Sequence, residues 1–157
     1  TFAYGYGLTV TPLQLAAAYL TIASGGLRRD ISLLHSSEAS ETRLYSNHIA
    51  DQVKQMLTRV VTEGTGKKAA IDSYHVAGKT GTVRKVGKKG YEDTQHIAFF
   101  AGMTPVKDPR LVGIVLINEP KSRAYGGGSI AAPVFSRVMA GALRLLNVPP
   151  NDFEEAA

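Results

Sequence analysis

The chain has 157 residues, of which 44% are hydrophobic, and it contains no cysteine. This length fits one domain or a piece of one, and the hydrophobic content fits a folded core rather than a disordered segment. The lack of cysteine excludes disulfides, a thiolate nucleophile and cysteine-type zinc sites. The net charge is +5. Part of it comes from Arg84, Lys85, Lys88 and Lys89, which we interpret as a solvated hairpin tip. No aromatic residues alternate with these cations, so we predict no nucleic-acid partner.

The first predicted helix begins after Thr11, where Pro12 occupies the first helical position and Gln14 completes a capping box. A pair of glycines ends it. Its side chains are apolar almost all round, which predicts a buried helix. Residues 28–46 are polar and mixed, and we expect a loop there with a short strand near residues 31–34.

A second helix is predicted over residues 47–63. Apolar side chains recur there at helical spacing, at Ile49, Val53, Met56 and Val60. A last helix is predicted over residues 131–146, after a run of three glycines. Its expected apolar stripe consists of Phe135, Val138, Ala142 and Leu145.

Three strands are predicted between these helices, over residues 74–86, 96–103 and 111–117. The short turns between them favour an antiparallel meander. The third strand is a continuous apolar run, which predicts a central strand that is covered on both faces.

The first of these strands carries the sequence Gly-Lys-Thr-Gly-Thr at residues 78–82. Side chains alternate along a strand, so Thr80 and Thr82 share one face and Lys79 takes the other. Twist, or a bulge at the glycines, would bring Lys79 back toward the same cleft. Two hydroxyls on one face can donate to a carboxylate, and a backbone N–H at a strand edge can point at a developing oxyanion.

Gly-Lys-Thr also ends the phosphate-binding P-loop, so a nucleotide-binding enzyme is an alternative. That motif needs a glycine five residues before its Gly-Lys, where this chain has Ser73. Its lysine must also open a helix, whereas the residues that follow here are β-branched and interrupted by glycine. We therefore favour the strand. Four histidines lack the spacing of a helical metal site, and we predict neither a metal nor a cofactor.

Three segments, matched in order and spacing, resemble class B penicillin-binding proteins, in particular the division-specific septal peptidoglycan D,D-transpeptidases of Gram-negative bacteria. They are residues 4–16, residues 76–82 with the Lys-Thr-Gly motif, and residues 125–135. The resemblance covers nearly all of residues 1–157. It implies the C-terminal part of a transpeptidase domain, with an α/β fold of the α+β type: a mainly antiparallel sheet with helices on both faces.

The resemblance implies serine acyl transfer between peptidoglycan stem peptides, and acylation by β-lactams. In that scheme Lys79 supplies positive charge and assists proton transfer. Thr80 and Thr82 bind the carboxylate of the substrate, and the backbone N–H of Thr82 is an oxyanion-hole donor. Gly81 keeps the strand open to the ligand.

Four further residues are expected to contact substrate. Relatives often carry aromatic residues near position 96 and just after Tyr125, where this chain has His96 and Gly126. We expect His96, Tyr125 and Gly126 to form a thinner wall, and Tyr6 to lie near it. For His96 a packing role is the alternative, and for Tyr6 a structural one.

No serine of this chain begins a Ser-x-x-Lys or a Ser-x-Asn pattern. We therefore expect the nucleophile to come from a companion N-terminal part of the same domain. The resemblance also implies divisome partners and a place on the periplasmic side of the inner membrane, with the anchor outside this chain; neither a membrane span nor a signal peptide is recognisable. The alternatives are a β-lactam sensor or carboxypeptidase, and a non-catalytic β-lactam-binding or scaffold module of the same fold.

Overall fold

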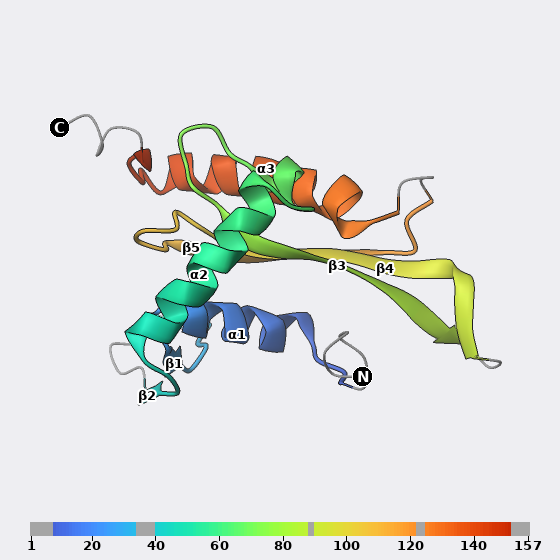
Figure 1. Cartoon of the computed structure of the whole chain (residues 1–157), viewed down its shortest axis with the longest axis horizontal. Coiled ribbons are helices and arrows are strands. Elements are labelled where there is room, and N and C mark those ends of the chain that lie inside the picture. Colours follow the sequence, from blue (N-terminus) through green and yellow to red (C-terminus); the bar gives the residue numbers. More distant parts are fainter. Residues whose placement is uncertain (1–7, 34–39, 88–89, 122–124, 152–157) are drawn as a thin grey trace.

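A three-stranded antiparallel sheet forms the middle layer of the molecule (Figure 1). In this computed structural model, the residues described are 8–33, 40–87, 90–121 and 125–151. The helix α3 (Gly127–Leu145) covers one face of the sheet and α1 (Pro12–Ala23) the other, while α2 (Asn47–Thr62) crosses beside them. Helices on both faces of an antiparallel sheet are the predicted arrangement.

The start of α1 confirms the predicted capping box. The Thr11 hydroxyl accepts a hydrogen bond from the Gln14 backbone N–H at 3.2 Å, and the Gln14 side chain accepts one from the Thr11 N–H at 2.8 Å. The prediction of burial on all sides is wrong. Only Tyr19 and Thr21 are buried, and Leu13 is 62% exposed. Apolar composition alone does not show which sides of a helix have neighbours.

The short strand predicted near residues 31–34 is also wrong where it can be checked, since residues 31–33 are not in a strand. Instead β1 (Leu27–Arg29) and β2 (Glu41–Arg43) form a small two-stranded sheet. The helix α2 has nearly the predicted bounds, and its N-cap is Ser46. Its buried side differs from the predicted stripe, because Ala50 and Val61 are buried whereas Ile49 and Met56 are exposed.

The main sheet consists of β3 (Ala77–Gly87), β4 (Gly90–Thr104) and β5 (Leu111–Asn118), paired as the predicted antiparallel meander. Its order is β3-β4-β5, so β4 is the central strand of the described sheet. Within the described sheet β5 is an edge strand, which differs from the prediction of a central strand. Helices on both faces account for its apolar run, but a run of apolar residues does not determine which strands are neighbours.

The β3–β4 hairpin extends beyond the end of β5. The pairing of β4 with β5 runs from Ile97 to Thr104, whereas the first part of β4 pairs with β3 alone. Figure 1 shows this part as an arm that projects from the rest of the molecule. We call it the hairpin arm.

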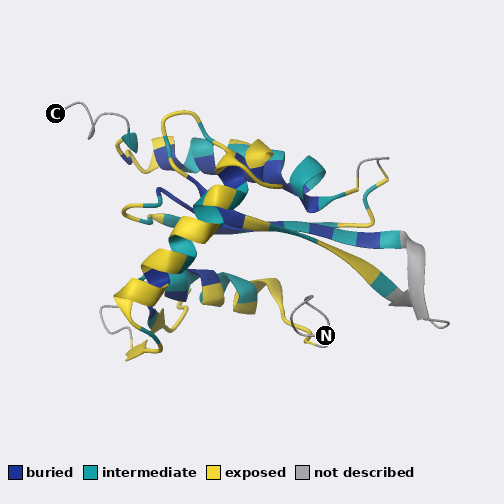
Figure 2. Cartoon of the chain, in the orientation of Figure 1, coloured by how far each residue is buried: buried dark blue, intermediate teal, exposed yellow. Residues whose placement is uncertain are grey.

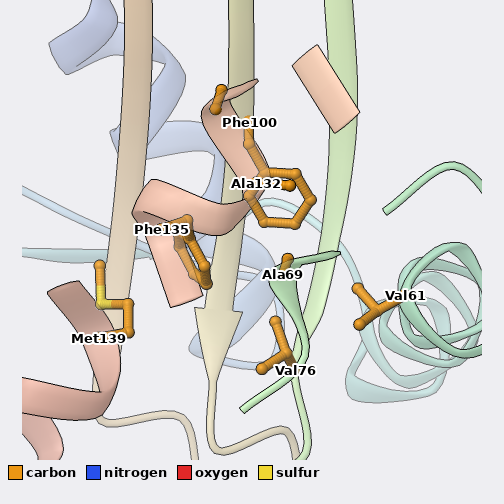
Figure 3. Close-up of a cluster of buried hydrophobic side chains, with 8 residues drawn as sticks. Val61, Ala69, Val76, Phe100, Ala132, Phe135 and Met139 are labelled. Carbon is orange, nitrogen blue, oxygen red and sulfur yellow. The ribbon is translucent and has the colours of Figure 1, made fainter. Parts of the chain in front are cut away.

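The main core lies between α3 and the sheet (Figure 3). The rings of Phe100 in β4 and Phe135 in α3 lie 4.8 Å apart. A side chain at Gly78 or Gly102 would collide with the Phe100 ring, so these glycines make room for it. The predicted stripe on α3 was correct at Phe135 but wrong at Val138 and Leu145, which are exposed. The helix begins four residues earlier than predicted, and its buried side chains include Ala132, Phe135, Met139 and Leu143.

A second core cluster lies where α1 meets the other face of the sheet. It contains Tyr19, Ala77, Ala101 and Met103. Tyr19 is only 8% exposed, and this burial raises the pKa of its phenol to about 12. In Figure 2, exposed residues lie on the outer side of α2 and on part of α1, whereas α3 and the sheet meet at buried ones.

Candidate active site

The strand β3 presents the Lys-Thr-Gly-Thr residues on alternate faces. Thr80 pairs with Phe100 and Thr82 with Ala98, so both threonines lie on the α3 face of the sheet. Lys79 lies on the α1 face, where its ammonium donates a hydrogen bond to the backbone carbonyl of Thr80 at 2.9 Å. Since Lys79 lies in a strand, it does not open a helix as a P-loop lysine must.

The bulge considered at the glycines is not present. Pairing with β4 is continuous from Ala77 to Arg84, and the register shifts only between Arg84 and Val86. Lys79 therefore stays on the face opposite the two threonines.

Packing explains why position 81 is a glycine, which the sequence alone did not show. A Cβ atom there would lie 2.1 Å from the ring of Phe99, which pairs with Gly81 and folds across it. The start of α3 lies equally close to the backbone of these two strands. A Cβ on Gly127 would lie 2.3 Å from the Phe99 carbonyl oxygen and 2.5 Å from that of Gly81. Gly81 therefore makes room for the Phe99 ring, and Gly127 lets the start of α3 dock directly on the backbone of β3 and β4.

A pocket of about 430 Å³ opens beside the two threonines. Its lining comes from three parts of the chain: Thr65, Lys67 and Lys68 after α2, Thr80 and Thr82 of β3, and residues 126–129 at the start of α3. The pocket thus brings together residues that are about 60 positions apart in the sequence.

Hydrogen bonds fix the threonine hydroxyls at this pocket. The hydroxyls of Thr65 and Thr80 lie 2.8 Å apart, and the backbone N–H of Gly127 donates to the hydroxyl of Thr82 at 3.1 Å. A hydroxyl that accepts a hydrogen bond keeps its own proton for donation, and a pair of hydroxyls uses only one of its two protons internally. The arrangement therefore suits a ligand that accepts two hydrogen bonds, such as a carboxylate.

The electrostatic environment of the pocket favours the same ligand. The N-terminus of α3 carries a partial positive charge, and the ammonium-bearing side chains of Lys67 and Lys68 line the pocket. Sequence reasoning missed Thr65, Lys67, Lys68 and Gly127. The run Gly-Thr-Gly-Lys-Lys at residues 64–68, directly after the predicted second helix, was the available signal.

Of the residues expected to form a wall beside the substrate, His96 and Tyr125 lie near the end of β3 that follows Thr82. His96 pairs with Arg84, two residues beyond Thr82, and is buried. Its ring stacks on that of Tyr125, with ring centroids 4.2 Å apart and an interplanar angle of 21°. Tyr125 is 46% exposed and precedes Gly126, the N-cap of α3, which also lines the pocket. Tyr6 lies outside the described residues.

Hydroxyl donors, cations and a helix N-terminus gather beside the Lys-Thr-Gly strand, an arrangement that suits the binding of a small anion. The family profile described as the penicillin binding protein transpeptidase domain matches residues 1–140. The chain therefore belongs to the penicillin-binding protein transpeptidase domain family, and among its members to class B, as the resemblance predicted. Within the described residues, no group of three potential ligands could hold a metal ion.

Individual relatives of the chain are named as peptidoglycan D,D-transpeptidases. The chain is 42% identical over 153 residues to the peptidoglycan D,D-transpeptidase FtsI of Escherichia coli (strain K12), covering 96% of this chain and 26% of that protein. It is 39% identical to the probable peptidoglycan D,D-transpeptidase PbpC of Pseudomonas aeruginosa, covering 99% of this chain and 28% of that protein. The chain thus spans about a quarter of the length of these relatives.

A solved structure supports the same assignment. The apo structure of the TP domain from Burkholderia pseudomallei penicillin-binding protein 3 matches with a TM-score of 0.90 at 39% identity. The match covers 96% of this chain and 47% of that one. The predicted fold class is confirmed by this likeness.

Proposed function

We propose that this chain is the carboxylate-binding part of a peptidoglycan D,D-transpeptidase that acts in cell division. The observation that carries the proposal is the pocket on the α3 face, where the hydroxyls of Thr80 and Thr82 meet the start of α3 and the Lys67 and Lys68 side chains. There Thr80 and Thr82 bind the terminal carboxylate of a stem peptide, or the carboxylate of a β-lactam. Hydrogen bonds to a charged acceptor are the stronger kind, which suits a site that orients a small anion.

The chemistry is acyl transfer through a serine ester. A serine hydroxyl from the rest of the domain attacks the carbonyl carbon of the penultimate D-alanine, and its proton passes to the departing amine of the terminal D-alanine. An amine of a second stem peptide then attacks the ester, forms the cross-link and releases the serine. A β-lactam acylates the same serine when its ring amide opens.

The free edge of β3 suits the oxyanion in this scheme. Among the described strands, only β4 pairs with β3, so the other edge of β3 has no strand beside it. We assign the backbone N–H of Thr82 as one oxyanion-hole donor. Lys79 supplies positive charge and assists proton transfer from the opposite face of the strand.

The companion part of the domain is expected on the α1 face. An apolar groove of about 300 Å³ runs there between residues 8–15 and the sheet. Val83 and Leu116, which line it, remain 36% and 47% exposed. Because the match covers about half of the solved domain, we propose that the nucleophile-bearing part of the same domain covers this groove and faces Lys79.

The likeness to the FtsI relatives supports a proposal for where the protein acts. We propose the periplasmic side of the inner membrane, with divisome proteins as partners and an anchor outside this chain. No helix in the described part of the chain is long and apolar enough to cross a membrane.

Labelling with a fluorescent penicillin, read by intact mass, tests the proposal. The samples are this chain alone and this chain together with the rest of its transpeptidase domain, with the heat-denatured joined sample as the control. We expect label only in the native joined sample, on a serine of the companion part. A native joined sample that takes no label would favour the non-catalytic scaffold instead.

A further inference from the structure

His96 holds both ends of the segment that connects β5 to α3. At one end, the backbone N–H of Glu119 donates a hydrogen bond to the His96 carbonyl at 2.8 Å. At the other end, the ring of Tyr125 stacks on the His96 ring. One residue of β4 therefore fixes the exit from β5 and the entry to α3, next to the pocket.

The side chain of Glu119 also contacts β3. Its carboxylate forms an ion pair with the ammonium of Lys85 in β3, close to the register shift between Arg84 and Val86. Its backbone has φ 52°, a left-handed conformation that a residue with a side chain adopts at some cost. Such a conformation persists when surrounding contacts determine it. Here those contacts come from β3 and β4.

These contacts lie at the base of the hairpin arm. Beyond this point β4 pairs only with β3, because the pairing with β5 ends at Ile97 and Asn118. The Lys85–Glu119 ion pair thus joins β3 to the residue that follows β5, next to the last pair of residues between β4 and β5. His96 is also two residues along the face from the partner of Thr82, a separation of about 7 Å along a strand.

We propose that Glu119 is a positioning residue for the candidate site. Its ion pair with Lys85 holds the base of the hairpin arm against the end of β5, and this keeps the stacked His96 and Tyr125 rings beside Thr82. The stack then favours ligands whose side chains carry a ring. This inference rests on the proposed function, and it adds a residue that touches neither the ligand nor the reacting atoms.

A merely structural role of the ion pair would change the melting temperature, whereas a positioning role would change the choice between ligands. The two side chains are partly exposed, at 28% and 48%, and exposed ion pairs contribute little to folding stability. Loss of the ion pair should therefore leave the melting temperature nearly unchanged. Its effect should appear in the choice between ligands, because the ring stack is what the contact positions.

The experiment uses the complete transpeptidase domain and two penicillins. Benzylpenicillin carries a ring-bearing side chain, and 6-aminopenicillanic acid lacks it. We expect Glu119→Gln to lower the ratio of their second-order acylation rate constants by roughly 2- to 10-fold, the range that an aromatic contact is worth. Exchanging the charges, with Lys85→Glu and Glu119→Lys together, should restore much of the ratio.

Glu41→Gln is the matched control, because Glu41 forms a surface ion pair with Arg29 at 2.8 Å in the small sheet. It should leave the ratio unchanged. If Glu119→Gln leaves the ratio unchanged in a domain that both penicillins acylate, the positioning role is wrong and the proposed function stands. The role is equally wrong if both rate constants fall alike together with the melting temperature. If neither penicillin acylates the unaltered domain, the proposed function itself fails.

Discussion

The α3 face and the α1 face of the sheet are built from alternate residues of the same three strands, yet they differ in how completely they are covered. On the α3 face, Phe100 and Phe135 are fully buried and the start of α3 touches the backbone of β3. On the α1 face, Val83 and Leu116 border an open apolar groove. The threonines lie on the covered face and Lys79 on the open one.

In the proposed function, this difference separates two tasks within one strand. Hydroxyls that orient a small anion need a rigid setting, and the covered face provides it through Gly127 and Thr65. A lysine that serves a nucleophile must face the part of the domain that carries the nucleophile. The alternation of a strand lets β3 do both, because neighbouring side chains point to opposite faces.

The largest expected effect concerns the core on the covered face. In this chain alone, Phe135→Ala should lower the free energy of unfolding by about 3–5 kcal/mol, because a fully buried aromatic leaves a cavity. Chemical denaturation measures this. In this chain alone, Leu116→Ala should cost much less, since half of that side chain is exposed. Equal costs for the two variants in the chain alone would contradict the contrast between the faces.

The close contact of α3 with β3 gives the second prediction. Gly127→Ala should destabilise the complete domain by about 1–3 kcal/mol, because the added methyl meets two backbone carbonyl oxygens that have little room to move. Gly141→Ala is the control in the same helix. Nothing lies within 4 Å of that position, so alanine should stabilise the helix by up to about 1 kcal/mol. Opposite signs of the two changes are the expected result.

Tyr19 tests how dry the α1 face is away from its open groove. Burial raises the pKa of Tyr19 to about 12 from its ordinary 10.0. The folded state thus holds the phenol proton more tightly than the unfolded state. The resulting stability is complete below pH 10 and is lost as the pH rises toward 12. Tyr19→Phe should make unfolding less dependent on pH in this window. Identical pH profiles for the variant and the unaltered domain would mean that the phenol is solvated.

The smallest effect is expected from the two cations at the pocket. Lys67→Gln together with Lys68→Gln should slow acylation by benzylpenicillin by roughly 2- to 5-fold at low salt, with the difference shrinking at high salt. Lys107→Gln, in the turn between β4 and β5, matches the loss of one charge and should have no such effect. A reduction that persists unchanged in 1 M salt would argue against an electrostatic role.

Local signals predicted much of the fold. The capping box at Thr11, the helix from Asn47 and the three strands depend on neighbouring residues, so the sequence alone could locate them. The alternation of Lys79, Thr80 and Thr82 followed from strand geometry in the same way.

Long-range packing explains what the sequence could not show. The pocket joins residues 65–68 to residues 126–129, and no periodicity relates the two segments. On the buried side of α3, the end of the Met139 side chain occupies the space beside Gly113 in β5. The place of β5 at the edge of the described sheet likewise depends on neighbours, which an apolar run does not identify.

The central claim, that Thr80 and Thr82 bind the carboxylate of the ligand, is tested most directly by a ratio of two rate constants. The complete domain is acylated with benzylpenicillin and with its methyl ester, which lacks the negative charge. We predict that the unaltered domain strongly prefers the acid and that Thr80→Val with Thr82→Val removes most of this preference, while Thr58→Ala on α2 leaves it intact. An acid-to-ester ratio that stays the same in the double variant would contradict the claim.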